Sequence, residues 1–165
     1  MHKRLWLFVL FIVALISDQI SKIAVDSAFS LYESKEIIGS YLKLTYIRNS
    51  GAAFGLSFGN SKVMFVVSVL VIVMLAFLFF KGQLRTEHFA GRAAVVLVFS
   101  GAFGNMMDRI RLGEVIDFID MGLKQHRWPI YNFADIYVTI GMIILFFTYA
   151  FTTEKTEKIK TSLPD

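Results

Sequence analysis

The sequence predicts an all-α membrane bundle of four transmembrane helices, accompanied by a small extracytoplasmic β-structure. Of the 165 residues, 56% are hydrophobic and 18% are charged, and the mean hydropathy is +0.61. Soluble domains contain about 45–50% apolar and about 25% charged residues. The chain also holds four long apolar segments with polar residues near their ends. A water-soluble globule could not bury this apolar surface, so we expect residues 1–165 to form a single integral membrane domain.

The four apolar segments are expected to span the bilayer as helices at about 5–25, 63–80, 89–107 and 133–151. Ser68 is the only polar residue in 63–80, and at about 1.5 Å per residue this segment reaches about 27 Å, close to a hydrocarbon core. The segment 5–25 follows a basic N-terminus, as a secretory signal peptide does. Because no small-residue cleavage pattern follows Ile16 and three more spans come later, we interpret it as a retained helix.

The distribution of basic residues predicts the orientation of the bundle. The cytoplasmic side of a membrane protein is enriched in Lys and Arg. A cytoplasmic N-terminus places eight of the 17 basic residues inside, namely Lys3, Arg4, Lys81, Arg85, Arg92, Lys155, Lys158 and Lys160. Both termini are then cytoplasmic, and the segments at about 26–61 and 108–132 lie outside. Dispersed basic residues without interleaved aromatic residues argue against a nucleic-acid partner.

The two outer segments are expected to fold over the helix ends. Tyr41 to Ile47 alternates apolar and polar residues, which predicts a half-buried strand, and a second extended stretch is expected after the turn at residues 49–51. Trp128, Pro129 and Tyr131 indicate an interfacial loop or helix at headgroup depth. Together these segments predict a small sheet and a flap.

The proposed topology gathers polar residues at the outer membrane boundary. Ionisable groups at membrane depth are costly and commonly mark a functional site. The chain has no cysteine, which excludes thiol chemistry. The three histidines lack a metal-binding spacing, so we expect no metal and no cofactor. The gathered residues are Asp18, Lys22, Asn105, Asp108, Arg109, Asp117, Asp120, Asn132 and Asp135.

Two kinds of hydrolytic chemistry fit these residues. Lys22 could serve as the base for Ser17 or Ser21, although Asp18, one helical turn away, should keep Lys22 charged. Two neighbouring aspartates fit better, because only one of them ionises easily: the anion can activate water while the protonated partner polarises a carbonyl. The candidates are Asp108, Asp117, Asp120 and Asp135, and spacing alone does not choose among them.

Each aspartate also has a structural interpretation. Asp108 lies beside Arg109, which favours an ion pair, and Asp135 opens a helix, where the dipole stabilises a carboxylate. A transporter using Asp18, Lys22 and Asp135 as a proton relay is a weaker alternative, because the segment 63–80 offers no polar path to the cytoplasm. A non-enzymatic scaffold would not explain carboxylates gathered at one depth.

Five sequence blocks resemble, in order, the motifs of the lipoprotein signal peptidase (signal peptidase II) family. They are Asp18-Gln-Ile-Ser-Lys22, Asn49-Ser-Gly-Ala-Ala-Phe-Gly55, Gly101-Ala-Phe-Gly-Asn-Met-Met-Asp-Arg109, Val115-Ile-Asp-Phe118 and Tyr131-Asn-Phe-Ala-Asp135. The resemblance implies an aspartyl endopeptidase of the bacterial inner membrane. Such an enzyme cuts diacylglyceryl-modified prolipoproteins just before the lipidated cysteine, and its site faces the periplasm.

The same resemblance implies roles for individual residues. Asp117 and Asp135 match the catalytic pair, and the outer strand matches the family's periplasmic β-cradle. Prolipoproteins and membrane lipids are the implied partners, globomycin-type cyclic peptides are the implied inhibitors, and we expect a monomer. The residues that match supporting and substrate-contacting positions are Asp18, Lys22, Asn49, Asn105, Asp108, Arg109 and Asn132.

Two features bear on substrate fit. Gly51 and the alanines after it could let a substrate backbone approach closely, or could simply pack against a helix. Tyr131 stands where the family usually has Phe, and Ile136 stands where Ser or Ala commonly follows the catalytic aspartate. Ser100 and Phe103 replace the commoner Gly and Leu. None of these departures replaces a carboxylate.

Overall fold

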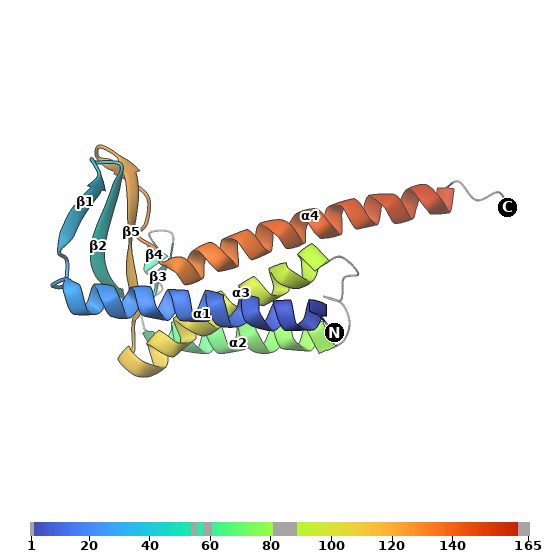
Figure 1. The fold of residues 1–165 in the computed structure, drawn as a ribbon, viewed down its shortest axis with the longest axis horizontal. Coiled ribbons are helices and arrows are strands. Elements are labelled where there is room, and N and C mark those ends of the chain that lie inside the picture. Colours follow the sequence, from blue (N-terminus) through green and yellow to red (C-terminus); the bar gives the residue numbers. More distant parts are fainter. Residues whose placement is uncertain (1, 54–55, 58–60, 81–88, 162–165) are drawn as a thin grey trace.

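The computed structural model describes residues 2–53, 56–57, 61–80 and 89–161. This part of the chain is mostly helical, with a small antiparallel sheet at one end of the helices (Figure 1). A helical protein with a small sheet was predicted, and this is confirmed. The helices are α1 (His2–Ala28), α2 (Ser61–Phe80), α3 (Phe89–Leu112) and α4 (Phe133–Thr161).

Each helix contains one of the predicted apolar segments and continues beyond it. α1 and α3 extend to Ala28 and Leu112 at their sheet ends, so Asp108 and Arg109 lie on a helix rather than in a following loop. The outer segments therefore begin later in the sequence than expected. Arg4–Ala28 and Phe89–Leu112 are long and apolar enough to cross a membrane, whereas α2 and α4 contain shorter apolar stretches, Lys62–Phe77 and Phe133–Thr148.

The sheet has the strand order β1-β2-β5-β6, with every neighbouring pair antiparallel. β2 (Leu42–Asn49) contains most of the strand predicted at 41–47, and it pairs with β1 (Ser34–Ile38). Two short strands, β3 (Ala52–Ala53) and β4 (Leu56–Ser57), follow the turn at 49–51 and form the extended stretch expected there.

The segment 108–132 differs from its prediction. Residues 108–112 complete α3, and the rest of the segment contains β5 (Val115–Leu123) and β6 (His126–Arg127), so the helix alternative of the expected interfacial loop or helix is wrong. The reason is tertiary: β5 pairs with β2 along one edge and with β6 and Tyr131 along the other, and residues 115–120 are all buried. The loop alternative holds only around Trp128, which is exposed.

A buried apolar cluster fixes the sheet on α1. Val25 of α1 packs with Tyr46 of β2 and with Ile116, Phe118 and Ile119 of β5. The antiparallel register pairs Ile47 with Asp117 and Asn49 with Val115, so the end of β2 lies beside the start of β5. This register brings the side chain of Asn49 to Asp117.

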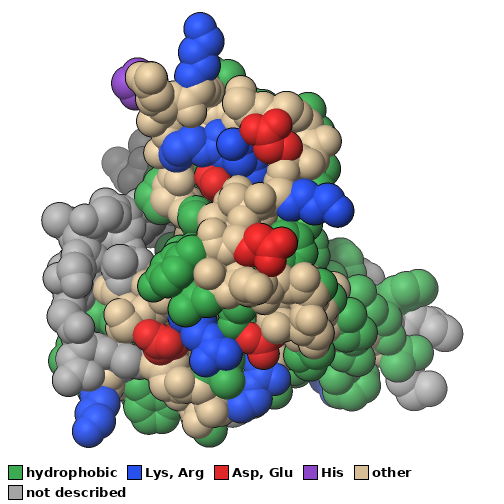
Figure 2. Space-filling view, turned by 90° about the vertical axis from the view of Figure 1, so that its left-hand side faces the viewer, with side chains coloured by type: hydrophobic (Ala, Val, Ile, Leu, Met, Phe, Trp, Pro, Cys, Tyr) green, Lys and Arg blue, Asp and Glu red, His purple; other side chains and the backbone are tan. Residues whose placement is uncertain are grey.

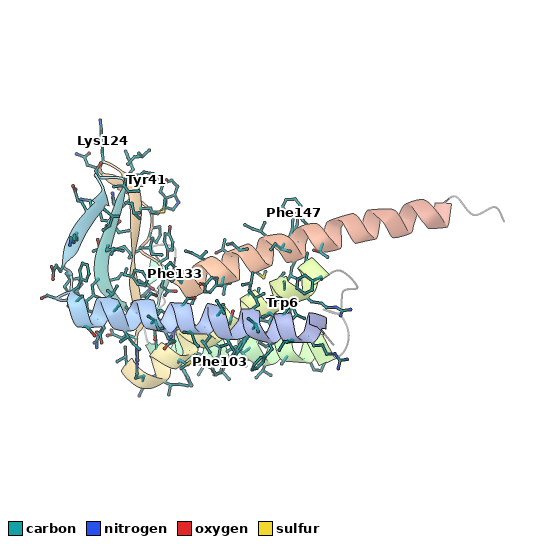
Figure 3. All side chains as sticks on the ribbon, in the orientation of Figure 1. Trp6, Tyr41, Phe103, Lys124, Phe133 and Phe147 are labelled. Carbon is teal, nitrogen blue, oxygen red and sulfur yellow. The ribbon has the colours of Figure 1, made fainter. Side chains whose placement is uncertain are left out.

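Small residues let the helices approach closely beneath the sheet. A Cβ atom added at Gly101 of α3 would lie 2.3 Å from the carbonyl oxygen of Ala134 in α4, and one added at Gly104 would lie 2.5 Å from Asp18 Oδ2. Because Gly101 and Gly104 have no side chain, α1, α3 and α4 can meet at the point where α4 begins. Phe133 marks this point, and Phe147 lies further along α4 (Figure 3).

The two ends of the molecule differ in surface chemistry. α1 begins and α4 ends on the side away from the sheet (Figure 1). On the sheet end, acidic and basic side chains are interspersed, whereas a broad hydrophobic surface lies to one side of them (Figure 2). Large hydrophobic side chains on the helices, including Phe8, Leu70 and Phe146, are more than half exposed. Such exposure suits helices surrounded by lipid.

Candidate active site

A cavity of about 940 Å³ lies between the sheet and the helices α2, α3 and α4. Its polar lining consists mainly of Asn49, Asn105, Arg109, Asp117 and Asp135. Its apolar lining includes Val67 and Val71 of α2, Ala102 of α3, and Val138 and Ile140 of α4. The cavity therefore combines two carboxylates with an apolar wall between helices.

Asp117 lies on β5 and is only 2% exposed. Asn49 Nδ2 donates a hydrogen bond to its Oδ2 atom at 2.9 Å, and Asn132 Nδ2 donates to its Oδ1 atom at 2.6 Å. Burial raises the pKa of Asp117 to about 7, and repulsion from Asp135 adds to the rise; the two amide hydrogen bonds and the charge of Lys22 offset only part of it.

Asp135 lies in the first turn of α4. Its Oδ1 atom accepts a hydrogen bond from Asn105 Nδ2 at 2.8 Å, and its Oδ2 atom accepts one from the backbone N–H of Asn132 at 3.1 Å. The backbone N–H of Asp135 in turn donates to Asn132 Oδ1 at 3.1 Å. This reciprocal pair satisfies N–H groups at the start of the helix, in the manner of a capping box. Asp135 thus has the expected capping position and also lines the cavity.

Behind the cavity lies a fully buried charge cluster. Lys22 Nζ is 3.0 Å from Asp18 Oδ2, 2.9 Å from Asp108 Oδ2 and 2.8 Å from Asn105 Oδ1. Asp18 Oδ1 also accepts a hydrogen bond from the backbone N–H of Ala134 at 2.9 Å, which attaches α1 to the start of α4. The predicted proximity of Asp18 and Lys22 is therefore confirmed.

The hypothesis of an ion pair between Asp108 and Arg109 is wrong. Asp108 forms its ion pairs with Lys22 and, at 3.5 Å, with Arg111 rather than with its neighbour Arg109. Arg109 instead donates to the carbonyl oxygen of Asn105 at 3.3 Å and lines the cavity. On a helix, successive side chains point in different directions, so sequence neighbours do not face each other.

The serine and lysine dyad is not assembled. Ser21 Oγ donates to the carbonyl oxygen of Asp18 at 2.7 Å, and Ser17 Oγ contacts the Ala14 carbonyl oxygen and the Tyr137 hydroxyl. Lys22 faces the two aspartates and Asn105 instead. The ammonium group of Lys22 thus pairs with two buried carboxylates, and the hydroxyl groups of Ser17 and Ser21 bind other partners.

Asp120, the fourth candidate, does not line the cavity. Its carboxylate accepts hydrogen bonds from Thr45 Oγ1 and Arg127 Nε, both at 2.8 Å. Asp117 and Asp120 are three residues apart on one strand, so their side chains point to opposite faces. Asp120 therefore joins strands, whereas Asp117 faces the site.

Gly51 has a packing role in the structure. Its φ is +135°, and an added Cβ atom would lie 2.5 Å from Met64 Cγ of α2. This close contact supports the alternative that the small residues here pack against a helix. Phe54 and Gly55 of the same sequence block lie outside the described residues.

The site also contains residues that the sequence did not single out. Gln19 Nε2 donates to Asp18 Oδ2 at 3.0 Å and to the Gly104 carbonyl oxygen at 3.3 Å, and its only sequence signal was its position between Asp18 and Lys22. The valines of α2 that line the cavity gave no signal, because apolar residues facing lipid and apolar residues facing a groove have the same composition. Among the described residues, no three His, Cys, Asp or Glu side chains form a metal-binding group.

A model of the family described as signal peptidase (SPase) II matches residues 10–151. A lipoprotein signal peptidase of Geobacter metallireducens is 40% identical over 134 residues, which cover 81% of this chain and 83% of that protein. One from Staphylococcus aureus is 34% identical over 148 residues, covering 88% of this chain and 90% of that protein.

The fold also matches a solved structure described as "Bacterial membrane enzyme structure by the in meso method at 2.3 A resolution". The TM-score is 0.79, the sequence identity is 32%, and the match covers 90% of each chain. The similarity extends over the helices and the sheet together.

Proposed function

This chain belongs to the signal peptidase II family, and from that premise we propose that it is an aspartic-type endopeptidase with Asp117 and Asp135 as its catalytic residues. Membership of the family makes it a membrane peptidase that processes lipoprotein signal peptides. The observation that carries the finer proposal is that Asp117 and Asp135, from different elements, line one cavity and both bond to Asn132.

In the proposed reaction, Asp117 holds a proton and Asp135 is the anion. Burial and the nearby charge of Asp135 favour the protonated form of Asp117. Asp135 accepts a proton from water as the water oxygen attacks the scissile carbonyl carbon, and Asp117 gives its proton to the carbonyl oxygen. When the tetrahedral intermediate collapses, the C–N bond breaks, the leaving amine takes the proton from Asp135, and a hydroxyl group of the intermediate returns its proton to Asp117.

The proposed substrate is a prolipoprotein with a diacylglyceryl-modified cysteine, cut on the N-terminal side of that cysteine. The apolar wall formed by Val67, Val71, Ala102, Val138 and Ile140 suits acyl chains or the apolar signal helix. Asn49, Asn105 and Arg109 supply side-chain hydrogen-bond donors at the polar end. Globomycin-type cyclic peptides are the proposed inhibitors, since they would compete for the same cavity.

We place the protein in the bacterial inner membrane as a monomeric single domain. In this placement all four helices span the bilayer, both termini are cytoplasmic and the sheet lies on the periplasmic side. The position of the sheet opposite the start of α1 and the end of α4 supports this topology (Figure 1). The excess of Lys and Arg around residues 3–4, 81–92 and 155–160 supports the same orientation.

Purified protein in detergent and a synthetic diacylglyceryl prolipoprotein peptide provide the test. Mass spectrometry of the products should show one cut, immediately before the lipidated cysteine. The same peptide without the lipid is the matched substrate control, and Asp117→Asn is the matched protein control. The absence of cleavage by wild type, or equal cleavage by the Asp117→Asn variant, would contradict the proposal.

A further inference from the structure

We propose that Lys22 is a positioning residue for the reaction, which acts through the side-chain amide of Asn105 to direct hydrogen-bond donors at Asp135 and Asp117. This inference rests on the proposed function, since it concerns the same two carboxylates. Lys22 is fully buried and is not among the residues that line the cavity. Lys22 therefore does not touch a substrate in the cavity, and it acts on the reaction through other side chains or through its charge.

The contact between Lys22 and Asn105 fixes the orientation of the amide. An ammonium group can only donate hydrogen bonds, so the amide atom 2.8 Å from Lys22 Nζ must be the oxygen. The Asn105 Nδ2 group then points to Asp135 Oδ1, at 2.8 Å. A flipped amide would set N–H against ammonium and oxygen against carboxylate, and both contacts would be repulsive.

The side-chain amide of Asn132 also has a fixed orientation, with its Nδ2 group directed at the second carboxylate, Asp117. Its Oδ1 atom accepts a hydrogen bond from the backbone N–H of Asp135, which leaves Nδ2 as the donor on the other side. That Nδ2 group donates to Asn105 Oδ1 at 3.1 Å and to Asp117 Oδ1 at 2.6 Å. Asn105 Oδ1 thus receives hydrogen bonds from both Lys22 and Asn132.

The resulting donor arrangement has a chemical consequence. Asn105 and the Asn132 backbone occupy one acceptor site on each oxygen of Asp135, and Asn132 and Asn49 do the same for Asp117. Only the remaining sites can take the water and the shared proton. Because both amides keep one orientation, the positions of the water and the proton relative to the substrate are also set.

The cation is held in place by charge rather than by the amide alone. Asp18 and Asp108 both contact Lys22, and none of the three side chains is exposed. The pair of catalytic carboxylates also lies within the electric field of this cluster. Besides each other, Asp117 and Asp135 face four charged groups, which are Asp18 and Lys22 from α1 and Asp108 and Arg109 from α3. Arg111 contacts Asp108 from the surface.

Two Lys22 variants test the proposal against a purely structural role. Lys22→Met removes both the charge and the donor, whereas Lys22→Gln keeps a donor that can face Asn105 Oδ1. The matched control is Val98→Ala, which shortens a buried side chain on the same helix, two turns before Asn105. This substitution perturbs the packing of α3 against α4 without touching the charge cluster. The measurements are kcat, KM and the pH profile for the lipidated peptide, with activity normalised to folded protein.

We expect Lys22→Met to lower kcat about 100-fold with little change in KM, since a misdirected proton transfer can cost about that factor. Lys22→Gln should retain more of kcat than Lys22→Met. In both variants the acidic limb of the pH profile should move to higher pH, because loss of the cation favours protonated carboxyl groups. Val98→Ala should keep the wild-type kcat and pH profile. Equal kcat and equal profiles for Lys22→Met and Val98→Ala would overturn the proposal.

Asn105→Asp keeps the test valid if the Lys22 variants do not fold. This substitution preserves side-chain size and the contact with Lys22, but an ionised carboxylate cannot donate to Asp135. We expect a loss of about 100-fold in kcat at neutral pH, partly restored at lower pH where the new carboxyl group is protonated and donates again. A kcat near the wild-type value at neutral pH would overturn the inference. Failure of wild type to cleave the peptide would instead overturn the proposed function.

Discussion

The backbone N–H of Asn132 donates to Asp135 Oδ2 and the backbone N–H of Asp135 donates to Asn132 Oδ1, both at 3.1 Å. This reciprocal cap starts α4 and holds the Asp135 carboxylate at the cavity wall. The same Asn132 side chain also donates to Asp117. One residue therefore sets the start of a helix and the relative positions of two carboxylates.

The relationship between Asn132 and Asp135 shows that capping and lining a site are not alternatives for Asp135. Each oxygen of the Asp135 carboxylate accepts one hydrogen bond, Oδ2 from the backbone N–H of Asn132 and Oδ1 from Asn105 Nδ2. A carboxylate oxygen can accept further bonds. Asp135 thus retains acceptor capacity toward the cavity.

The first prediction concerns the reaction chemistry. Asp117→Asn and Asp135→Asn should each lower turnover by about 10³-fold or more, because an amide of the same size cannot accept or supply the proton. Both variants should still fold. The measurement is cleavage of the lipidated peptide, with circular dichroism as the check on folding.

A metal chelator distinguishes this chemistry from metal-assisted hydrolysis. Wild-type activity should be unchanged by a chelator, since the two carboxylates alone handle the proton. Chelator inactivation reversed by added metal would contradict the assignment, as would near wild-type cleavage by either Asn variant.

The second prediction follows from the pKa of Asp117, which is raised from 3.8 to about 7 by burial and by Asp135. Between these values the folded protein keeps the proton and the unfolded chain releases it, so the stability of the folded state falls as pH rises. The stabilising contribution is complete below about pH 4 and lost above about pH 7. At about 1.4 kcal/mol for each pKa unit, it amounts to roughly 4 kcal/mol.

Asp117→Asn removes this pH dependence. The Tm of the variant relative to wild type should therefore be higher at pH 8 than at pH 5, whatever the fixed cost of replacing an oxygen by an amino group. Thermal unfolding of both proteins in the same detergent measures the difference. Parallel Tm curves for the two proteins across this range would contradict the raised pKa.

The third prediction concerns the buried cluster. Asp18→Ala should lower Tm as well as activity, because it leaves Lys22 less compensated and removes the acceptor for the Ala134 N–H. Removing one partner of a buried ion pair costs about 3–5 kcal/mol. Glu36→Ala is a useful control, since its ion pair with Lys43 is partly exposed and contributes little. An inactive Asp18→Ala protein with wild-type stability would assign Asp18 to the chemistry instead.

The fourth prediction tests the topology. Reporters of cytoplasmic and periplasmic location, fused after Phe80 and after Met121, should give opposite results, with Phe80 on the cytoplasmic side. The expectation follows from the Lys and Arg residues that flank the ends away from the sheet. If both fusions reported the same side, the proposed placement of the cavity at the periplasmic face would fail.

Local features of the structure followed directly from the sequence. Helix positions could be predicted because long apolar segments must satisfy their backbone groups internally in a membrane. The alternation within 41–47 predicted β2, and the spacing of Asp18 and Lys22 predicted their contact, because residues four apart on a helix are neighbours. These signals depend only on residues that are near one another in the sequence.

The choice among the four candidate aspartates needed the tertiary structure. Reasoning from spacing left Asp108, Asp117, Asp120 and Asp135 equivalent, and only the family resemblance favoured two of them. Folding buries Asp108 against Lys22, which is 86 positions earlier, and pairs Asp120 with Arg127. Asp117 and Asp135 remain at the cavity. Contacts between residues on different helices and strands leave no periodic pattern in the sequence.

Local signals also gave the wrong structure for one segment. The aromatic residues near 128–131 suggested an interfacial loop or helix for the segment 108–132, yet residues 115–123 of this segment form the most buried strand of the sheet. A strand becomes buried through the neighbours it pairs with, and β5 pairs with β2, more than 60 residues earlier. The sequence by itself determined which segments are apolar and which charged residues lie near the outer ends of these segments. Only the tertiary structure decided which of those charges neutralise one another and which face the cavity, because that depends on long-range contacts.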